Sequence, residues 1–564
     1  MLRIVVALLI VGLVGVAAFA FGYISGDAES SEIRRLLTKV ERNLNEIRGL
    51  PTSEEQAVAQ FESTFIRFRG ELYPLPDSHF ENGGGLTIWD GSLLLVDRRG
   101  SVFRFVDGEG LVRTAIETPE HGDDAYSAFA ARPENADRRH RPDKLRYNDI
   151  MFVENEAFRG LVVSYNFFDP DRVCYGNRLA KLPVGPDALP EAFQANASDW
   201  EVFFDAQPCL NFRPGGTAIE ALQAGGRMDM HPDGRLILAS GDFALDGITA
   251  PDIGLMDPDV HYGKILAVDI STGEAEAISV GHRNVQGVAV DVNGEIWSVE
   301  HGVRGGDELN HIAKGENHGW PREGLGTLYS GQPLPFEGPP GRHDVYDKPA
   351  FAWLPSAATS ALESIDNFHP AWDGGLLVGS LSSPRFGQSL FHVRTEGERV
   401  VFVERIRLDR RVRYVQQFGD RLALWLDPTD LLILEQVARF DPVQVAMAVL
   451  NENHPDVADQ VSATLKSCNE CHSYEERVHL AGPSLNGVVG RSVAATSFEG
   501  YSEGLMAFGG TWTEARLAEY LVDPAAVVPG TSMPAMGLQE GPALDALIDA
   551  LKSMDSLNFE HLTY

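Results

Sequence analysis

The chain has 564 residues, of which 44% are hydrophobic and 23% are charged. These proportions are those of ordinary globular proteins and allow several domains with buried cores. The 81 acidic residues outnumber the 47 lysines and arginines, so the formal net charge is −34. Such a balance argues against nucleic-acid binding, which needs basic patches, and it is compatible with basic redox partners or divalent cations.

The chain begins with a long apolar stretch. Residues 4–24, IVVALLIVGLVGVAAFAFGYI, carry no charge and are numerous enough to cross a membrane. Apolar residues then recur at three- and four-residue steps, which predicts an amphipathic helix. We predict a transmembrane signal anchor at 1–26 and a helical stalk at 27–55. The alternative is a signal peptide cleaved near Ala18-Phe19-Ala20.

Short apolar runs dominate the next four hundred residues, and most of them follow a turn. The runs are DGSLLLVD (90–97), FRGLVVSYNF (158–167), DGRLILAS (233–240), NGEIWSVE (293–300), DGGLLVGS (373–380) and GDRLALWL (419–426). A turn glycine followed by an apolar strand indicates a hairpin. Recurrence at blade-sized intervals indicates radial repetition. We therefore predict a mainly β chain with a six-bladed β-propeller at 56–443; the alternative is a large β-sandwich, which would not need one unit repeated so often.

The composition changes near residue 444. QVAMAVLNENHPDVADQVSATLKS (444–467) is the first long helix-compatible stretch after the stalk, and it leads into CNECH at 468–472. C-x-x-C-H is the attachment signature of a c-type haem, in which both cysteines form thioethers and the histidine faces the iron. Taken alone, the motif could also be a zinc half-site or a redox dithiol. We predict an all-α domain at 444–564.

Residues 466–537 resemble a class I cytochrome c. The shared landmarks are CNECH, AGPSLNGVVGR (481–491) and TWTEARLAEYLVDPAAVVPGTSM (511–533). The resemblance implies haem c bound through Cys468 and Cys471, with His472 and Met533 as iron ligands. Met536 competes with Met533 for the role of iron ligand, and its alternative role is that of a packing residue in the flanking loop. Residues that the resemblance places around the haem are Pro483, Arg491, Tyr501, Trp512, Tyr520 and Thr531.

The haem motif bears on the compartment, because c-type haem is attached outside the cytoplasm. With the anchor, it predicts an inner-membrane protein whose body lies in the periplasm, or a secreted periplasmic form if the N-terminus is cleaved. Cys174 and Cys209 remain outside the motif. An oxidising compartment favours a disulfide between them, although two separate buried thiols are the alternative that spacing cannot decide.

The stretch GHRNVQGVAVDVNGEIWSVEHGVRGGDELNHIAKGENHGWP (281–321) resembles the soluble PQQ-dependent glucose and aldose-sugar dehydrogenases (the glucose/sorbosone dehydrogenases). These are six-bladed propellers that bind pyrroloquinoline quinone (PQQ) with calcium. The resemblance implies quinone contacts from Arg283 and Asn284, and carboxylate contacts from Arg411 and Arg413 in RRVRYV (410–415). Guanidinium groups suit planar carboxylates. Further residues implied in the site are Arg227 in the G-R turn, Trp353 as an aromatic at its mouth, and the calcium candidates Gly302, Val303, Asp307 and Glu308.

The chain departs from this family at the catalytic base. The family has a histidine four residues before the arginine of its G-R turn, and here that position is Gln223, before Arg227. An amide cannot accept a proton from a sugar hydroxyl, so hydride transfer would lack its base. The base is therefore unknown, and the candidates are His231, His301 and Asp149. A PQQ-cradling glutamine expected near 144–152 and a lysine expected after LVGSL are also absent.

Two functions follow from these observations. In the first, the chain is a quinohaemoprotein dehydrogenase that passes electrons from an aldose or alcohol through PQQ to the fused cytochrome c, and then to a periplasmic or membrane acceptor. A tethered acceptor has a high effective concentration, which favours this interpretation. In the second, the propeller is non-catalytic and serves as a ligand- or partner-binding platform for a tethered electron-transfer cytochrome c. The missing histidine and lysine favour the second.

Overall fold

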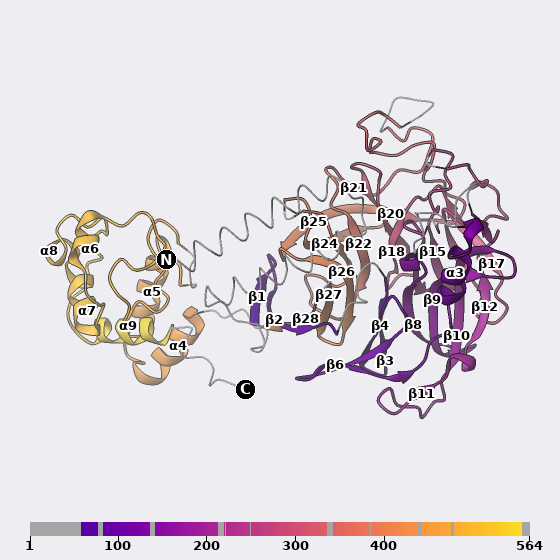
Figure 1. Cartoon of the computed structure of the whole chain (residues 1–564). Helices are drawn as coiled ribbons and strands as arrows, with labels where there is room; N and C mark the ends of the chain where they lie inside the picture. Colours follow the sequence, from indigo (N-terminus) through magenta and orange to yellow (C-terminus); the bar gives the residue numbers. More distant parts are fainter. Residues whose placement is uncertain are drawn as a thin grey trace, which may run out of the picture. The chain divides into compact units, whose positions relative to one another are not determined.

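The computed structural model of the chain describes residues 58–554, apart from 77–82, 136–141, 213–218, 220, 249, 335–341, 384, 428, 438–441 and 475–478. The chain divides into two compact units, one ending at Val437 and the other starting at Ala438 (Figure 1). The predicted membrane anchor and stalk at 1–55 lie outside the described residues. Among the helices that are described, none combines the length and the apolar character that a membrane span needs.

The first unit consists of antiparallel sheets of four or five strands, taken here as blades in chain order. Blade one is β3 (Gly85–Trp89), β4 (Ser92–Val96), β5 (Val102–Val106) and β6 (Gly110–Arg113); blade two is β8 (Tyr147–Glu154), β9 (Arg159–Asp169), β10 (Cys174–Pro183), β12 (Glu201–Asp205) and β13 (Leu210–Asn211); blade three is β14 (Gly225–Met230), β15 (Leu236–Ser240), β16 (Lys264–Val268) and β17 (Ala275–Val280). Blade four is β18 (Val285–Val290), β19 (Ile296–Glu300), β20 (Asp307–Ile312) and β21 (Phe351–Trp353); blade five is β22 (Thr359–Ile365), β23 (Gly375–Ser380), β24 (Ser389–Glu396) and β25 (Arg399–Arg407); blade six is β26 (Arg411–Phe418), β27 (Arg421–Asp427), β28 (Asp430–Val437), β2 (Arg67–Pro74) and β1 (Val58–Glu62).

The first strands of the six blades form a closed ring. β3 contacts β8, and contacts continue through β14, β18, β22 and β26 back to β3. Blade six joins the two ends of the unit, because β2 pairs with β28 from Arg67 opposite Val437 to Pro74 opposite Asp430. This arrangement confirms the predicted six-bladed propeller.

The six apolar runs of the sequence supply the second strand of each blade: β4, β9, β15, β19, β23 and β27. Every residue of β15, β19 and β23 is buried. A second strand has sheet neighbours on both sides and adjacent blades on both faces, so neither face meets water. This position explains why these strands are continuously apolar rather than alternating.

Polar side chains on the first strands join neighbouring blades at four of the six junctions. The bonds run from a main-chain N–H to a side-chain oxygen of the preceding blade: Phe152 N to Thr87 Oγ1 (2.8 Å), Met228 N to Asp149 Oδ2 (2.9 Å), Val290 N to Asp229 Oδ2 (2.7 Å) and Gln417 N to Glu363 Oε1 (2.9 Å). Asp149, Asp229 and Glu363 line a cavity of about 280 Å³, which we call the axial cavity.

Short elements complete the first unit. They are β7 (Ala115–Ile116), which pairs with β11 (Gln194–Ala195) in parallel, helix α3 (Asp123–Ala130) and the 3₁₀ turns Pro133–Asn135, Pro142–Lys144 and Ala197–Asp199. A disulfide joins Cys174 at the start of β10 to Cys209 beside β13, where the sequence had left free thiols as the alternative.

The second unit is helical. Its helices are α4 (Pro442–Asn453), α5 (Ala458–Asn469), α6 (Glu503–Phe508), α7 (Glu514–Val522), α8 (Pro524–Val527) and α9 (Pro542–Ser553). Helix α9 contacts α4, α5 and α7, and its buried face includes Leu544, Leu547 and Leu551. Three helices begin at a residue whose side chain accepts a hydrogen bond from the first turn: Ser502 for α6, Thr513 for α7 and Asp523 for α8.

Candidate functional sites

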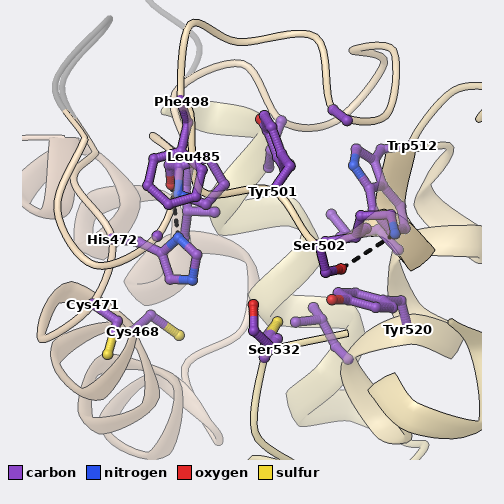
Figure 2. A pocket seen from close by; sticks show the side chains of 18 of the residues that line it. Cys468, Cys471, His472, Leu485, Phe498, Tyr501, Ser502, Trp512, Tyr520 and Ser532 are labelled. Carbon is purple, nitrogen blue, oxygen red and sulfur yellow. Dashed lines mark hydrogen bonds between the residues drawn. The ribbon is translucent and has the colours of Figure 1, made fainter. Parts of the chain in front are cut away.

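A cavity of about 250 Å³ lies inside the helical unit, and mostly apolar side chains line it (Figure 2). Cys468, Cys471 and His472 lie on one side, and Ser532, Trp512 and Tyr520 lie across from them. The cysteines belong to the end of helix α5 and the turn that follows it. We call this space the C-terminal cavity.

His472 is oriented by the main chain. Its Nδ1 donates to the carbonyl oxygen of Pro483 at 2.7 Å. Because that bond places the proton on Nδ1, the other ring nitrogen, Nε2, keeps a lone pair for a metal. Gly482 packs against the imidazole so closely that a Cβ there would meet His472 Cε1 at 2.4 Å. A larger side chain at 482 would displace the ring.

Met533 lines the same cavity, from the loop between α8 and α9. A hydrogen bond of 2.6 Å joins the hydroxyls of Tyr520 and Thr531, and Met533 N donates to Thr531 Oγ1 at 3.3 Å. These bonds fix the loop that presents the thioether. Met536 is not among the lining residues.

The other residues expected around the haem also lie at this cavity. Pro483, Arg491, Tyr501, Trp512 and Tyr520 all line it, whereas Thr531 acts behind Tyr520 and Met533. Arg491 donates to the carbonyl oxygens of Asn486 (2.7 Å) and Ser484 (2.8 Å), and its burial lowers its pKa. Lining residues that the sequence did not identify are Leu485, Phe498, Ser502 and Leu505; only their apolar or small character in a loop-rich stretch could have indicated them.

In the propeller, a cavity of about 340 Å³ gathers guanidinium groups. Arg227, Arg411 and Arg413 were predicted there, and Arg146 is the fourth. We call this space the arginine cavity, defined by these four residues. Asn284 and His301 also line it, while Arg283, Gly302 and Val303 line a small adjacent cavity that His301 shares. The structure thus brings most of the predicted PQQ contacts to one region.

Arg411 and Arg413 share one carboxylate. Arg413 Nη2 donates to Asp427 Oδ2 at 2.6 Å, and Arg411 Nε lies 3.5 Å from the same oxygen. Arg411 also donates to the carbonyl oxygen of Leu381 at 3.1 Å. Both guanidinium groups therefore contact the same carboxylate oxygen.

Arg227 lies at the boundary between the arginine cavity and the axial cavity, because it lines both. Its guanidinium lies 3.6 Å from the centre of the Tyr414 ring and 3.8 Å from Asp149 Oδ1. Burial raises the pKa of Asp149 to about 7, and the charge of Arg227 opposes that rise. Asp149, a candidate base, uses both oxygens to accept main-chain N–H groups, from Ile150 and Met228.

Gln223, at the position expected for the base, bridges two charged groups. In the amide orientation that satisfies both neighbours, its nitrogen donates to Asp242 Oδ1 at 2.6 Å and its oxygen accepts from Arg283 Nη2 at 2.9 Å. Trp320 Nε1 donates to the other oxygen of Asp242 at 2.7 Å. Burial raises the pKa of Asp242 to about 7, and Arg283 opposes the rise.

The two histidine candidates differ in position. His231 lies in the β14–β15 turn, 2.9 Å from Asp233, and lines neither the arginine cavity nor the axial cavity. His301 follows β19 and lies on the wall of the arginine cavity, with Nδ1 3.3 Å from Asn284 Nδ2. Burial lowers the pKa of His301 despite the opposing charge of Asp307, so the imidazole is neutral at pH 7.

The calcium candidates lie together but are bonded within the chain. Arg283 Nη1 donates to the carbonyl oxygen of Gly302 at 2.8 Å, and Asp307 Oδ1 accepts from Gly302 N at 3.2 Å. Glu308 is buried beside Asn310, whose Nδ2 lies 3.4 Å from its Oε2. Across the described residues, no three or more His, Cys, Asp or Glu side chains form a group that could hold a metal. Calcium at Gly302, Val303, Asp307 and Glu308 therefore stays a prediction.

Trp353 requires a correction. It is 7% exposed, packs edge-on against Phe351 and Phe391, and lines neither the arginine cavity nor the axial cavity. It ends strand β21, which places the indole inside the blade core instead of at a mouth. Arg146, Tyr414 and Asp427 are residues of this region that the sequence did not identify; Tyr414 stands in RRVRYV, but only the arginines of that motif were singled out.

Comparisons with known proteins agree with this division. The glucose/sorbosone dehydrogenase family model matches residues 189–430. The uncharacterized Synechocystis protein slr1608 is 32% identical over 248 residues, which are 40% of this chain and 56% of that protein. Aldose sugar dehydrogenase YliI of Escherichia coli is 35% identical over 158 residues, 27% of this chain and 40% of that enzyme. The matched part thus spans about half the length of these propeller relatives.

One solved glucose dehydrogenase covers 65% of this chain and 99% of its own, with 23% identity and a TM-score of 0.50, a likeness that shows the fold alone. Cytochrome c2 iso-2 of Magnetospirillum molischianum is 39% identical over 87 residues, 15% of this chain and 90% of that protein. The chain therefore belongs to the cytochrome c family through its helical unit, which is fused to a propeller that the glucose/sorbosone dehydrogenase model matches over residues 189–430.

Proposed function

We propose that this protein is a membrane-anchored periplasmic haem c electron-transfer protein, and that its propeller is a PQQ-dependent dehydrogenase for an aldose or another alcohol. One observation carries the proposal: a single chain combines a C-x-x-C-H cavity with a propeller cavity lined by four arginines. The first suits haem and the second suits a polycarboxylate cofactor such as PQQ. The tether keeps electron donor and acceptor at a high effective concentration.

The C-terminal cavity fits haem c. Cys468 and Cys471 would form the thioethers, His472 would bind iron through Nε2, and Met533 would supply a sulfur ligand from the other wall. A haem with these ligands would carry one electron at a time, and a methionine ligand raises its reduction potential. The apolar lining excludes water, and Arg491 and Tyr501 supply polar atoms at the cavity wall.

The arginine cavity fits a planar, multiply charged cofactor. Its guanidinium groups would bind carboxylates, and Asn284 would donate an amide N–H. PQQ, when bound, would accept the two electrons that leave an alcohol carbon. Arg283 would stabilise negative charge that develops nearby, since it lines the adjacent cavity and is only 7% exposed.

The hydroxyl proton of the substrate still needs an acceptor. Gln223 cannot serve, and His231 is bound to Asp233 in a hairpin turn. We propose His301, which is neutral at pH 7 and lies on the cavity wall beside Asn284. Calcium at the carbonyl groups of Gly302 and Val303 belongs to the same proposal.

The second candidate is a propeller without catalysis, acting as a binding platform for the tethered cytochrome. The bridge that Gln223 makes between Asp242 and Arg283 favours it, because these two charged groups then satisfy each other instead of a substrate. In both candidates the acceptor is a periplasmic or membrane redox protein, and the N-terminal helix or a cleaved signal peptide would determine attachment.

The test is a titration of the full chain, matured with haem, with PQQ and calcium by calorimetry, followed by aldoses or alcohols. Binding at micromolar PQQ and reduction of the haem absorbance by substrate would support the dehydrogenase. Arg413→Gln should weaken PQQ binding. Arg421→Gln, which removes another arginine of blade six, one that pairs with Asp107 of blade one, should leave PQQ binding unchanged. Absence of PQQ binding would reject the quinoprotein; binding without haem reduction by any substrate would favour the platform.

A further inference from the structure

Arg146 lies in the wall of the arginine cavity, directly before the first residues of β8. It is 9% exposed, and its guanidinium makes two hydrogen bonds: Nε to Asn148 Oδ1 at 3.2 Å and Nη2 to the carbonyl oxygen of Ala221 at 3.0 Å. Both acceptors are neutral. The third nitrogen, Nη1, makes no hydrogen bond to any residue that the structure describes.

The ion pairs at this cavity involve the other three arginines. Arg411 and Arg413 share Asp427, and Arg227 lies 3.8 Å from Asp149. Within the described residues, Arg146 takes part in no ion pair. A buried cation without a partner is costly, and burial together with Arg413 lowers the pKa of Arg146 to about 10.

Hydrogen-bond donors are also in excess at this wall. Asn148 Nδ2 and Arg413 Nε are buried and have no partner in the described part of the chain, and both residues line the cavity. Buried N–H groups are rarely left without an acceptor, and those that are indicate a missing water, ion or ligand. Asn148 stands next to Arg146 and holds its Nε, so the unpaired charge and one of the unpaired donors occupy the same part of the wall.

We infer that Arg146 is a ligand-binding residue, and that the arginine cavity takes a compound with at least two carboxylate groups, one at Arg411 and Arg413 and another at Arg146. The inference deepens the proposed function, since PQQ is one compound of this class. Arg146 is absent from the motifs that suggested PQQ. A guanidinium group binds a carboxylate through two parallel N–H donors, and Nη1 is available for the first of them.

A purely structural role of Arg146 predicts a different effect of its loss on ligand affinity. If Arg146 only braced the loop at Ala221, its charge would be unnecessary, because a neutral side chain such as glutamine could also donate to that carbonyl. Loss of Arg146 would then change stability and leave ligand affinity unchanged. The two roles are therefore separated by measuring binding and folding on the same variants.

The experiment uses the haem-matured full chain and two probes, PQQ and benzene-1,3,5-tricarboxylate, with dissociation constants measured by calorimetry at fixed salt. Arg146→Gln is the test variant and Arg421→Gln the matched control. We expect Arg146→Gln to weaken both probes by about 10- to 100-fold, the usual effect of losing a charge-assisted hydrogen bond. The control should bind as the wild type does, and melting curves should show both variants folded.

Equal affinity of wild type and Arg146→Gln for a bound probe would overturn the inference, as would a wild type that binds neither probe. If the tricarboxylate binds and depends on Arg146 while PQQ does not bind, the inference stands and the proposed function fails. If Arg146→Gln does not fold, Arg146→Lys is the test variant. Lysine keeps the positive charge but lacks the two parallel N–H donors of the guanidinium group, so we expect several-fold weaker binding. Wild-type affinity of Arg146→Lys would contradict the assignment.

Discussion

Restoring a histidine at residue 223 is the sharpest test of the propeller's chemistry. Gln223 lies between Asp242 Oδ1 at 2.6 Å and Arg283 Nη2 at 2.9 Å. An imidazole there would donate one N–H to Asp242. Its other nitrogen would face Arg283, which lines the small cavity next to the arginine cavity. A general base contributes roughly 10²- to 10⁴-fold to a rate. We therefore expect Gln223→His to raise the rate of substrate-driven haem reduction by about this factor.

The assay is stopped-flow absorbance of the haem in protein loaded with PQQ and calcium, at saturating substrate. Gln223→Asn is the control, since it keeps an amide and supplies no base. The Gln223→His rate should rise with pH as the imidazole loses its proton. Equal rates for Gln223→His and Gln223→Asn, with PQQ shown to be bound in both, would refute the argument that this position lacks only its base.

Three further outcomes are expected. Met533→Ala should remove the spectrum of a six-coordinate, low-spin haem with histidine and methionine ligands, while Met536→Ala should leave it intact; the reverse result would exchange the two assignments. Burial raises the pKa of Glu363 to about 8, so the propeller should become less stable as pH rises from about 4.5 to 8, because the folded state holds a proton that the unfolded state releases. Glu363→Gln should flatten this pH dependence of the free energy of unfolding, measured by chemical denaturation. An unchanged slope would show that Glu363 is not its source. Replacing Cys174 and Cys209 by alanine opens a loop with a sequence separation of 35 residues. If the disulfide acts by lowering the conformational entropy of the unfolded chain, this should reduce the free energy of unfolding by about 4 kcal/mol in denaturant titrations. A loss below about 1 kcal/mol would contradict this entropic explanation.

The sequence predicted the second strand of every blade because those strands are buried on both faces and follow turn residues. It did not predict how the ring closes. The pairing of Arg67–Pro74 with Asp430–Val437 joins segments about 360 residues apart, and neither segment carries a local signal of its partner. Closure is a property of the whole ring, since each blade must already be in place before the last edge can pair.

The two candidate sites also differ in how far the sequence predicted them. The residues of the C-terminal cavity follow one another in short motifs, so the resemblance to class I cytochromes c was sufficient to predict that His472 and Met533 share one cavity. The four arginines of the arginine cavity come from three different blades. Arg227 and Arg413 were found through family motifs, whereas Arg146 precedes a strand with no recognisable pattern, and its importance lies in charges that only the fold brings together.

Raised carboxylate pKa values often mark catalytic groups, but in this propeller most of them have another cause. Asp149, Asp229 and Glu363 each accept a main-chain N–H from the following blade, and their pKa values rise mainly because the axial position removes them from water. Their oxygens are engaged in holding neighbouring blades together, which argues against Asp149 as the proton acceptor. Asp242 differs, because its partners Gln223, Arg283 and Trp320 surround the expected position of the base. The raised pKa values of the axial carboxylates therefore reflect burial where the ring is held closed, and they do not by themselves mark a catalytic group.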